Sequence, residues 1–165
     1  MSETPLIPPP REFLGPFLSM GARVIGFRPH KTPVRTEGHR WSRFKSEVTL
    51  RVVFDCLVFL QAASQRESIA APCLRLAEGK HIELCLSPAV LTEVGDVLSR
   101  PSIRSRFATL NDSLVTEFLR ALTRFGKMYP LVREHVTCER DPKDEPYLNL
   151  AIGAEARFLA SRDFR

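Results

Sequence analysis

The sequence lacks the features that would place the protein in a membrane, on a secretory route or around a structural zinc ion. No apolar run approaches the roughly 18 residues that a membrane-spanning helix needs, and no basic segment followed by an uninterrupted apolar stretch opens the chain. The four cysteines form no Cys-x-x-Cys pair and have no histidine at zinc-site spacing. We interpret them as reduced core residues, and we expect a cytoplasmic protein that does not contact a membrane.

A general excess of basic charge is also missing from most of the chain. The 165 residues carry a formal net charge of +5, but residues 1–48 hold eight Lys and Arg against four Asp and Glu, whereas residues 49–165 hold sixteen against fifteen. The larger part is therefore nearly neutral, and its charge alone does not indicate nucleic-acid binding. Its length suits one domain with a sizeable core.

Residues 1–48 contain seven of the 13 prolines and show no helical or strand periodicity over a useful length. This composition predicts a basic, proline-rich, disordered arm in front of a domain over residues 49–165. Cations and aromatic residues alternate between Arg28 and Lys45, an arrangement suited to tracking a phosphate backbone while stacking on bases. The other interpretation, a solvated tail without function, stays open.

After residue 48 the sequence alternates between strand-like and helix-like segments. The β-branched run from Leu50 to Phe54 predicts a buried first strand that ends in Asp55, and Ser87-Pro88 and Asn111 predict helix starts. Further strands are expected at 81–86, 131–136 and 157–160, and helices at 57–63, 68–78, 88–99, 103–107, 112–125 and 146–155. This alternation favours a parallel sheet covered by helices on both faces.

Four acidic residues are expected to converge at one edge of that sheet. Asp55 and Asp163 follow predicted strands, and Glu93 and Asp144 lie near the starts of predicted helices. Clustered carboxylates repel one another unless a cation neutralises them, and oxygen ligands without Cys or His suit Mg²⁺ or Mn²⁺. Such an ion activates water and stabilises charge on a phosphate, which points to metal-assisted phosphodiester hydrolysis.

Each acid also has a purely structural interpretation. Glu93 can be a solvated helix residue, Asp144 a helix N-cap and Asp141 a turn-former. Phosphatase or nucleotide chemistry at the same carboxylates is a further alternative.

Four spaced blocks carry a resemblance to a known family. They are Val52-Val53-Phe54-Asp55-Cys56, Leu86-Ser87-Pro88-Ala89-Val90-Leu91-Thr92-Glu93-Val94 with Leu98-Ser99-Arg100-Pro101, Arg140-Asp141-Pro142-Lys143-Asp144-Glu145-Pro146-Tyr147-Leu148-Asn149-Leu150-Ala151, and Leu159-Ala160-Ser161-Arg162-Asp163. Together they resemble a PIN domain, in particular the PIN-type ribonuclease toxins of bacterial toxin–antitoxin systems, over nearly all of residues 49–165. The resemblance implies a Rossmann-like, three-layer α/β/α sandwich with a central, mostly parallel sheet.

The resemblance also implies an activity and roles for particular residues. We expect a Mg²⁺- or Mn²⁺-dependent endoribonuclease that hydrolyses RNA, is neutralised by a cognate antitoxin and, as family members often do, forms a homodimer. The expected metal ligands and catalytic residues, which would hold the ion and position the attacking water, are Asp55, Glu93, Asp144 and Asp163. Supporting roles fall to Asp141, Glu145 and Ser161, and RNA contacts to Arg140, Lys143 and Arg162.

The chain departs from the family pattern in two places. Leu57 stands where the family normally has an asparagine, and a leucine side chain forms no hydrogen bond. Leu57 therefore favours an alternative, a catalytically impaired PIN-like module that binds RNA or an antitoxin without cutting. The sequence also stops at Phe164-Arg165, where the family normally continues into a final strand, so we expect the sheet to lack its last strand.

Overall fold

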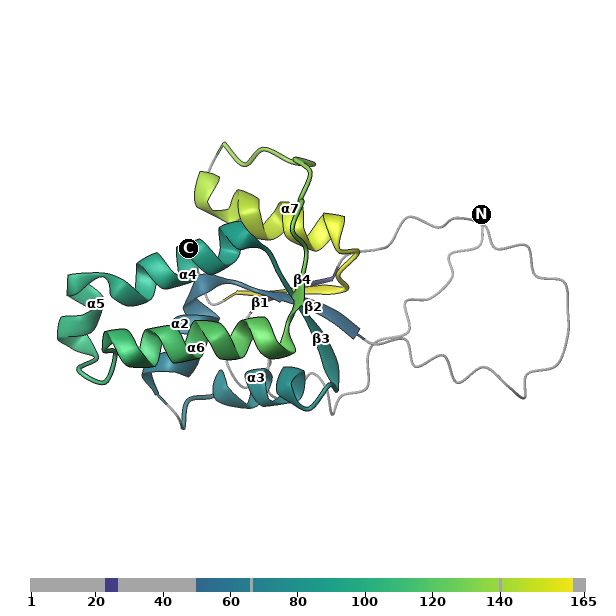
Figure 1. The fold of residues 1–165 in the computed structure, drawn as a ribbon. Coiled ribbons are helices and arrows are strands. Elements are labelled where there is room, and N and C mark those ends of the chain that lie inside the picture. Colours follow the sequence, from purple (N-terminus) through teal and green to yellow (C-terminus); the bar gives the residue numbers. More distant parts are fainter. Residues whose placement is uncertain (1–22, 27–49, 66, 140, 162–165) are drawn as a thin grey trace, which may run out of the picture.

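The structure of this chain is a computed structural model that describes residues 23–26, 50–65, 67–139 and 141–161 (Figure 1). The strands are β1 (Arg23–Gly26), β2 (Leu50–Phe54), β3 (Ile82–Leu86), β4 (Lys127–Met128) and β5 (Phe158–Ser161). The helices are α2 (Cys56–Ser64), α3 (Ala71–Glu78), α4 (Pro88–Ser99), α5 (Pro101–Arg106), α6 (Asp112–Phe125) and α7 (Glu145–Gly153), with a 3-10 turn, η1 (Pro142–Asp144), before α7. No described helix is long and apolar enough to cross a lipid bilayer.

The strands form one sheet in the order β1-β5-β2-β3-β4. β2 pairs in parallel with β3 on one side and with β5 on the other, and β3 pairs in parallel with β4. β1 runs antiparallel to β5, with Arg23 opposite Ser161 and Gly26 opposite Phe158. Because β2 is the central strand, Asp55 emerges from the middle of the carboxyl edge of the sheet.

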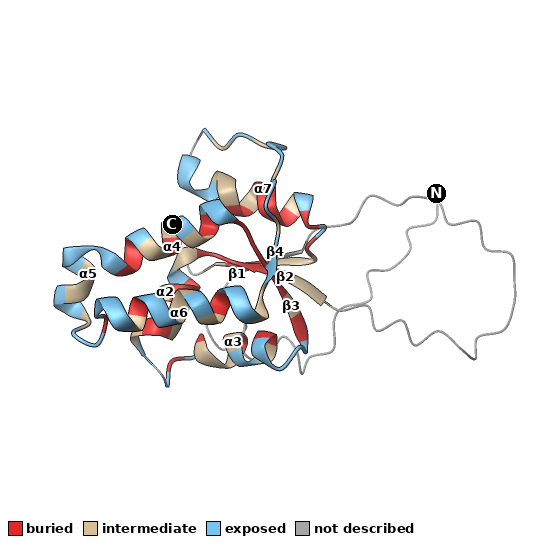
Figure 2. Cartoon of the chain, viewed as in Figure 1, coloured by how far each residue is buried: buried red, intermediate tan, exposed pale blue. Residues whose placement is uncertain are grey.

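Helices cover both faces of the sheet. Figure 1 shows α7 on one face and α2, α3 and α6 on the other. The core lies between these layers: β2, β3, β5 and the inward helix faces are largely buried, whereas β4 and the outer helix faces are exposed (Figure 2). Val52, Val53 and Phe54 of β2 are at most 1% exposed, as expected for a strand covered on both faces. The predicted three-layer α/β/α architecture with a mostly parallel sheet is confirmed.

Short-range chemistry explains where several elements begin and end. The hydroxyl of Ser87 accepts a hydrogen bond from the amide three residues on (3.3 Å), and Pro88 opens α4 where its missing N–H costs nothing. The Asn111 side chain caps α6 in the same way at 2.8 Å. Gly126 ends α6, and a Cβ at this position would lie 2.8 Å from the carbonyl oxygen of Leu122 and 2.4 Å from a methyl carbon of Leu86, so any side chain here would force its surroundings to shift.

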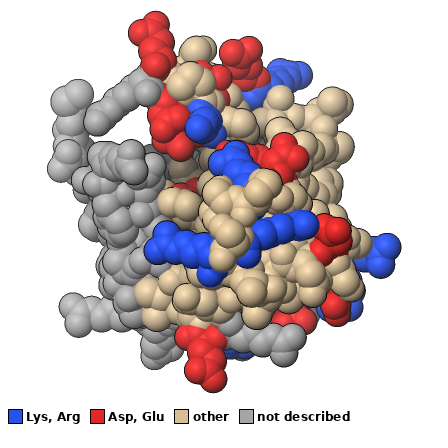
Figure 3. Space-filling model, turned by 90° about the vertical axis from the view of Figure 1, so that its left-hand side faces the viewer, with Lys and Arg blue, Asp and Glu red and all other residues tan. Residues whose placement is uncertain are grey.

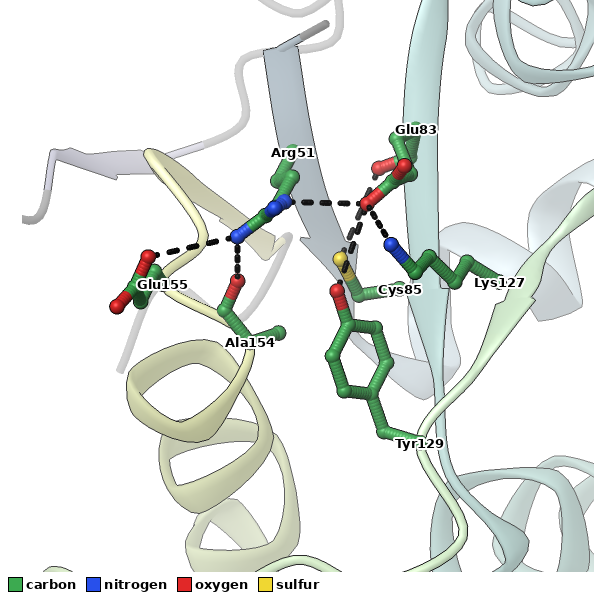
Figure 4. A network of polar contacts seen from close by, with 7 residues as sticks. All are labelled: Arg51, Glu83, Cys85, Lys127, Tyr129, Ala154 and Glu155. Carbon is green, nitrogen blue, oxygen red and sulfur yellow. Dashed lines mark hydrogen bonds and ion pairs between the residues drawn. The ribbon is translucent and has the colours of Figure 1, made fainter.

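A polar network joins the amino ends of the strands (Figure 4). Glu83 of β3 pairs with Arg51 on the neighbouring β2, with 3.1 Å between Oε1 and Nε. The same Oε1 lies 3.4 Å from Lys127 Nζ and accepts a hydrogen bond from the Tyr129 hydroxyl at 3.4 Å. Arg51 also reaches Glu155 (3.5 Å) and a main-chain carbonyl at the end of α7 (3.0 Å). The Glu83 carboxylate thus joins three strands at the edge opposite Asp55, and Arg51 extends the network to the end of α7.

The N-terminal segment differs from its prediction at four residues. Arg23–Gly26 form β1, whereas the sequence predicts a disordered arm over residues 1–48. The backbone of β5 would otherwise present an unpaired edge, and β1 satisfies it through four paired positions. β1 therefore occupies the edge of the sheet beside β5. The other residues of 1–48 lie outside the described residues, and the domain boundary at residue 49 stays a prediction.

The predicted strand at 131–136 is wrong. This segment is irregular, and the strand that leads back to the sheet is the short β4 immediately after α6. The amides of His135 and Val136 donate to the side-chain oxygen of Asn149, at 2.7 and 2.9 Å, instead of to a neighbouring strand. Leu131 is 92% exposed, so the apolar pattern that suggested a strand is not buried.

Candidate active site

Asp55 lies where β2 ends and α2 begins, and it is only 8% exposed. Its backbone amide donates to the carbonyl of Ala160 on β5 at 3.0 Å. Its Oδ1 accepts hydrogen bonds from the amides of Leu57 and Val58, both at 3.0 Å, and thereby caps α2. The positive end of the helix dipole also favours a negative charge at this position. The carboxylate is therefore fixed at the carboxyl edge of the sheet by the backbone on two sides.

The second oxygen of the same carboxylate is held by β5. The hydroxyl of Ser161, the last residue of that strand, donates to Asp55 Oδ2. The two residues are 106 positions apart in the sequence and meet because β2 and β5 are adjacent parallel strands. Ser161 was expected in a supporting role, and its hydroxyl fixes the orientation of the Asp55 carboxylate.

Glu93 shares its surroundings with Asp55. It lies half-buried on α4, and the charges of both acids act on the thiol of Cys56 and the hydroxyl of Tyr147. Burial, followed by Asp55 and Glu93, raises the pKa of the Cys56 thiol to about 11. Burial is also the largest cause of the raised pKa of Tyr147, with Cys56 and Glu93 adding to it. The carboxylates of Asp55, just after β2, and of Glu93, on α4, thus act on the same two groups.

The acids around α7 have other contacts. Asp144 is exposed at the end of η1, and its side chain forms no capping hydrogen bond with α7. Asp141 accepts a hydrogen bond from the amide of Lys143 at 3.2 Å and caps η1, in agreement with its interpretation as a turn-former. Glu145 accepts from the amide of Cys138 at 2.8 Å. Glu145 therefore supports the loop that precedes α7, and the Lys143 side chain is exposed.

The donor set fits a hard divalent cation, although only part of it can be described. Among the residues that the structure describes, no three His, Cys, Asp or Glu side chains converge as a metal site. Asp163, Arg140 and Arg162 lie outside the described residues, so their predicted roles stay predictions. Mg²⁺ keeps several of its waters and commonly takes only one or two protein carboxylates together with substrate phosphates. Asp55 and Glu93 are the two described carboxylates that act together on Cys56 and Tyr147, and both are of the ligand type that Mg²⁺ prefers.

Two residues near the acids were not singled out from the sequence. Tyr147 is 2% exposed, and its hydroxyl interacts with Cys56 and Glu93. The signal was available in the sequence, because Tyr147 precedes Leu150 and Ala151 at helical spacing and so belongs to the buried face of α7.

Arg100 is the second such residue. It ends α4, is exposed, and its positive charge acts on the Cys56 thiol. The side of the molecule that carries α5 is shown in Figure 3, where Lys and Arg side chains cross the middle of the surface and acidic side chains lie above them. α5 follows Arg100 directly and carries Arg106 together with Arg104, whose guanidinium is already paired with Asp112. Cations are therefore available on the outside of the site for a polyanionic ligand.

Comparison with known proteins gives one match. A family model described as PIN domain matches residues 51–165, a span that runs from the start of β2 through every acid discussed above. Neither the curated proteins nor the solved structures include a significant match to the chain.

Proposed function

The chain belongs to the PIN domain family, whose members are generally nucleases that use divalent metal ions, and we propose that it is a Mg²⁺- or Mn²⁺-dependent endoribonuclease. One observation carries the proposal. Asp55 is a buried carboxylate at the carboxyl end of the central strand, its two oxygens are oriented by the α2 amides and Ser161, and Glu93 acts on the same neighbours, Cys56 and Tyr147. Ligands and catalytic groups in parallel sheets lie at this edge.

In the proposed reaction the side chains of the protein would hold the cation, orient its ligands and attract the RNA. A bound divalent cation would supply an activated water and stabilise the negative charge that develops on the scissile phosphate. Asp55 and Glu93 would hold that cation, with Asp144 and Asp163 as the further ligands that the sequence predicts. Ser161 keeps the Asp55 carboxylate from rotating. Arg100, at the outer end of α4, is placed to attract the RNA backbone.

Membership of the family also supports a more specific role. We propose that the chain acts as the toxin of a toxin–antitoxin system in the cytoplasm, where a cognate antitoxin protein restrains it, and that it forms a homodimer as such toxins often do. Co-expression with the product of a small neighbouring gene tests the antitoxin. Growth arrest by the chain alone that this product relieves would support the role, and absence of any growth effect at equal expression would contradict it.

The central experiment replaces Asp55 with asparagine. Asparagine is a good N-cap and keeps an oxygen for the Leu57 and Val58 amides, so Asp55→Asn removes the negative charge while leaving α2 capped. Loss of a metal ligand exceeds the 10- to 100-fold effect of losing an outer-shell partner, so cleavage of single-stranded RNA should fall by more than about 100-fold. Asp96→Asn, at an exposed position on the helix that carries Glu93, is the matched control and should cut normally.

The wild-type chain should cut with Mg²⁺ or Mn²⁺ and stop cutting in EDTA. Cleavage that persists in EDTA, or an Asp55→Asn protein as active as the Asp96→Asn control, would refute the proposal.

The second candidate function is RNA or antitoxin binding without cleavage, and Leu57 favours it. This side chain is 36% exposed on the first turn of α2, next to the Asp55 carboxylate, where a hydrogen-bonding group was expected. Leu57→Asn separates the two functions because it changes no buried packing. Nuclease activity that appears only in Leu57→Asn identifies the natural chain as the non-cutting form, whereas activity in both chains rules that candidate out.

A further inference from the structure

The hydroxyl of Tyr147 is a buried polar group that makes no hydrogen bond of good geometry, although Glu93 and Cys56 lie within its reach. The residue is 2% exposed, and its oxygen contacts neither solvent nor an acceptor with good geometry. α7 places it there, because Pro146 sets the first turn and Leu150 and Ala151 hold the same helix face against the core. Native proteins keep few such groups, and each one calls for a role that the folded chain alone does not reveal.

The surroundings of this hydroxyl point to its partner. Cys56, Glu93 and Asp55 are the groups that act on it electrostatically. Asp55 is already engaged on both oxygens, by two α2 amides and by Ser161, and a thiol is a weak acceptor. The Glu93 carboxylate is half-buried and belongs to another helix, so it can turn without disturbing the sheet.

We propose that Tyr147 is a positioning residue, whose hydroxyl donates a hydrogen bond to the Glu93 carboxylate when that carboxylate turns to hold a divalent cation together with Asp55. This inference rests on the proposed function. A metal-binding carboxylate is usually held by a hydrogen bond from a neighbouring group, and the loss of that neighbour typically weakens metal binding 10- to 100-fold. Tyr147 would donate a hydrogen bond to the Glu93 carboxylate, as the Ser161 hydroxyl does to the Asp55 carboxylate.

Tyr147→Phe tests the role because it removes only the hydroxyl oxygen, which makes no hydrogen bond of good geometry in the structure. The affinity of the full chain for Mn²⁺, measured by calorimetry without RNA, should fall by about 10-fold or more. The thermal midpoint of the metal-free protein should stay the same or rise, because an unpartnered buried hydroxyl is lost. A purely structural tyrosine would give the reverse result, a lower midpoint and an unchanged Mn²⁺ affinity.

The chain offers a matched control in its only other tyrosine. Tyr129 donates to Glu83 at the opposite edge of the sheet. Tyr129→Phe should leave the Mn²⁺ affinity unchanged and should not raise the thermal midpoint of the metal-free protein. Glu93→Ala provides the background for a double-mutant cycle, in which adding Tyr147→Phe should cause no further loss of Mn²⁺ affinity.

Three outcomes overturn the inference. Equal Mn²⁺ affinities of wild type and Tyr147→Phe refute the positioning role alone, and so does an undiminished Tyr147→Phe effect in the Glu93→Ala background. A wild-type chain that binds no Mn²⁺ at all refutes the proposed function itself, and the inference with it.

Discussion

Replacing Glu83 with glutamine tests how strongly the amino-edge network holds the sheet. Glu83 Oε1 lies 3.1 Å from Arg51 Nε and 3.4 Å from Lys127 Nζ, and accepts from the Tyr129 hydroxyl at 3.4 Å. Glutamine has the same length and can still accept through its oxygen. Glu83→Gln therefore removes the charge that the two cations share and leaves the packing intact.

The size of the effect follows from the exposure of the partners. Hydrogen bonds to charged groups contribute about 1.5 to 3 kcal/mol when buried, and exposed ion pairs about 0 to 1 kcal/mol. The side chains of Arg51 and Glu83 are 37% and 24% exposed, so the pair lies between these limits. We expect Glu83→Gln to lower the free energy of unfolding by about 1 to 2 kcal/mol, or the thermal midpoint by roughly 3 to 6 °C.

Urea unfolding measures this difference, and Glu78→Gln is the matched control. Glu78 pairs with Arg124 at 3.8 Å, and the two side chains are 59% and 75% exposed, so its loss should change the free energy of unfolding by less than about 0.5 kcal/mol. High salt should leave part of the Glu83 effect in place, because half-buried pairs are screened less than exposed ones. Equal effects of the two variants would refute the reasoning.

Two further predictions concern the loop before α7 and the buried thiols. Asn149→Ala removes the acceptor of the His135 and Val136 amides and should cost about 2 kcal/mol. Tryptic cleavage after the exposed Arg133 should then be faster in a gel time course than in the Thr137→Ala control, and equal rates would contradict this prediction. Burial raises the pKa of Cys73 from 9.0 to about 12. Its neutral thiol therefore stabilises the fold fully below pH 9 and progressively less from there toward pH 12. Urea unfolding at about pH 7 and about pH 10 should show the wild-type advantage over Cys73→Ala shrinking by roughly 1 kcal/mol, and a constant difference would contradict it.

Elements with local chemical signals were predictable from the sequence. Ser87 and Asn111 cap their helices with their own side chains, and Asp55 follows a β-branched run whose last three residues are buried. Gly79 ends α3 as predicted, although the left-handed backbone position falls on Lys80, whose φ is 61°. All four cysteines are free, but only Cys73 and Cys85 are fully buried. Such signals depend on a few neighbouring residues and survive in any tertiary context.

The remaining features depend on distant partners. β1 pairs with the edge of β5, which lies far away in the sequence. The residues around Arg23–Gly26 do not indicate this distant partner. The sequence of residues 131–136 predicts a strand. Two amides of this segment instead donate hydrogen bonds to the side chain of Asn149, which lies on the later helix α7. The sequence does not single out Tyr147 for a related reason. The fold alone brings its hydroxyl to Cys56 and Glu93 and leaves it without a hydrogen bond of good geometry.

The pairing of β2 with β5 also limits the order in which parts of the protein can fold. Asp55 and Ser161 meet across 106 residues, and β1 adds a pairing of still longer range to the same strand. Contacts of this kind are slow to form because a long loop must close before they can stabilise anything. A chain emerging from the ribosome can assemble β2, β3 and the helices between them first, while Asp55 still lacks Ser161. The carboxylate pocket is therefore completed late in folding, and partly synthesised chains do not contain the finished site.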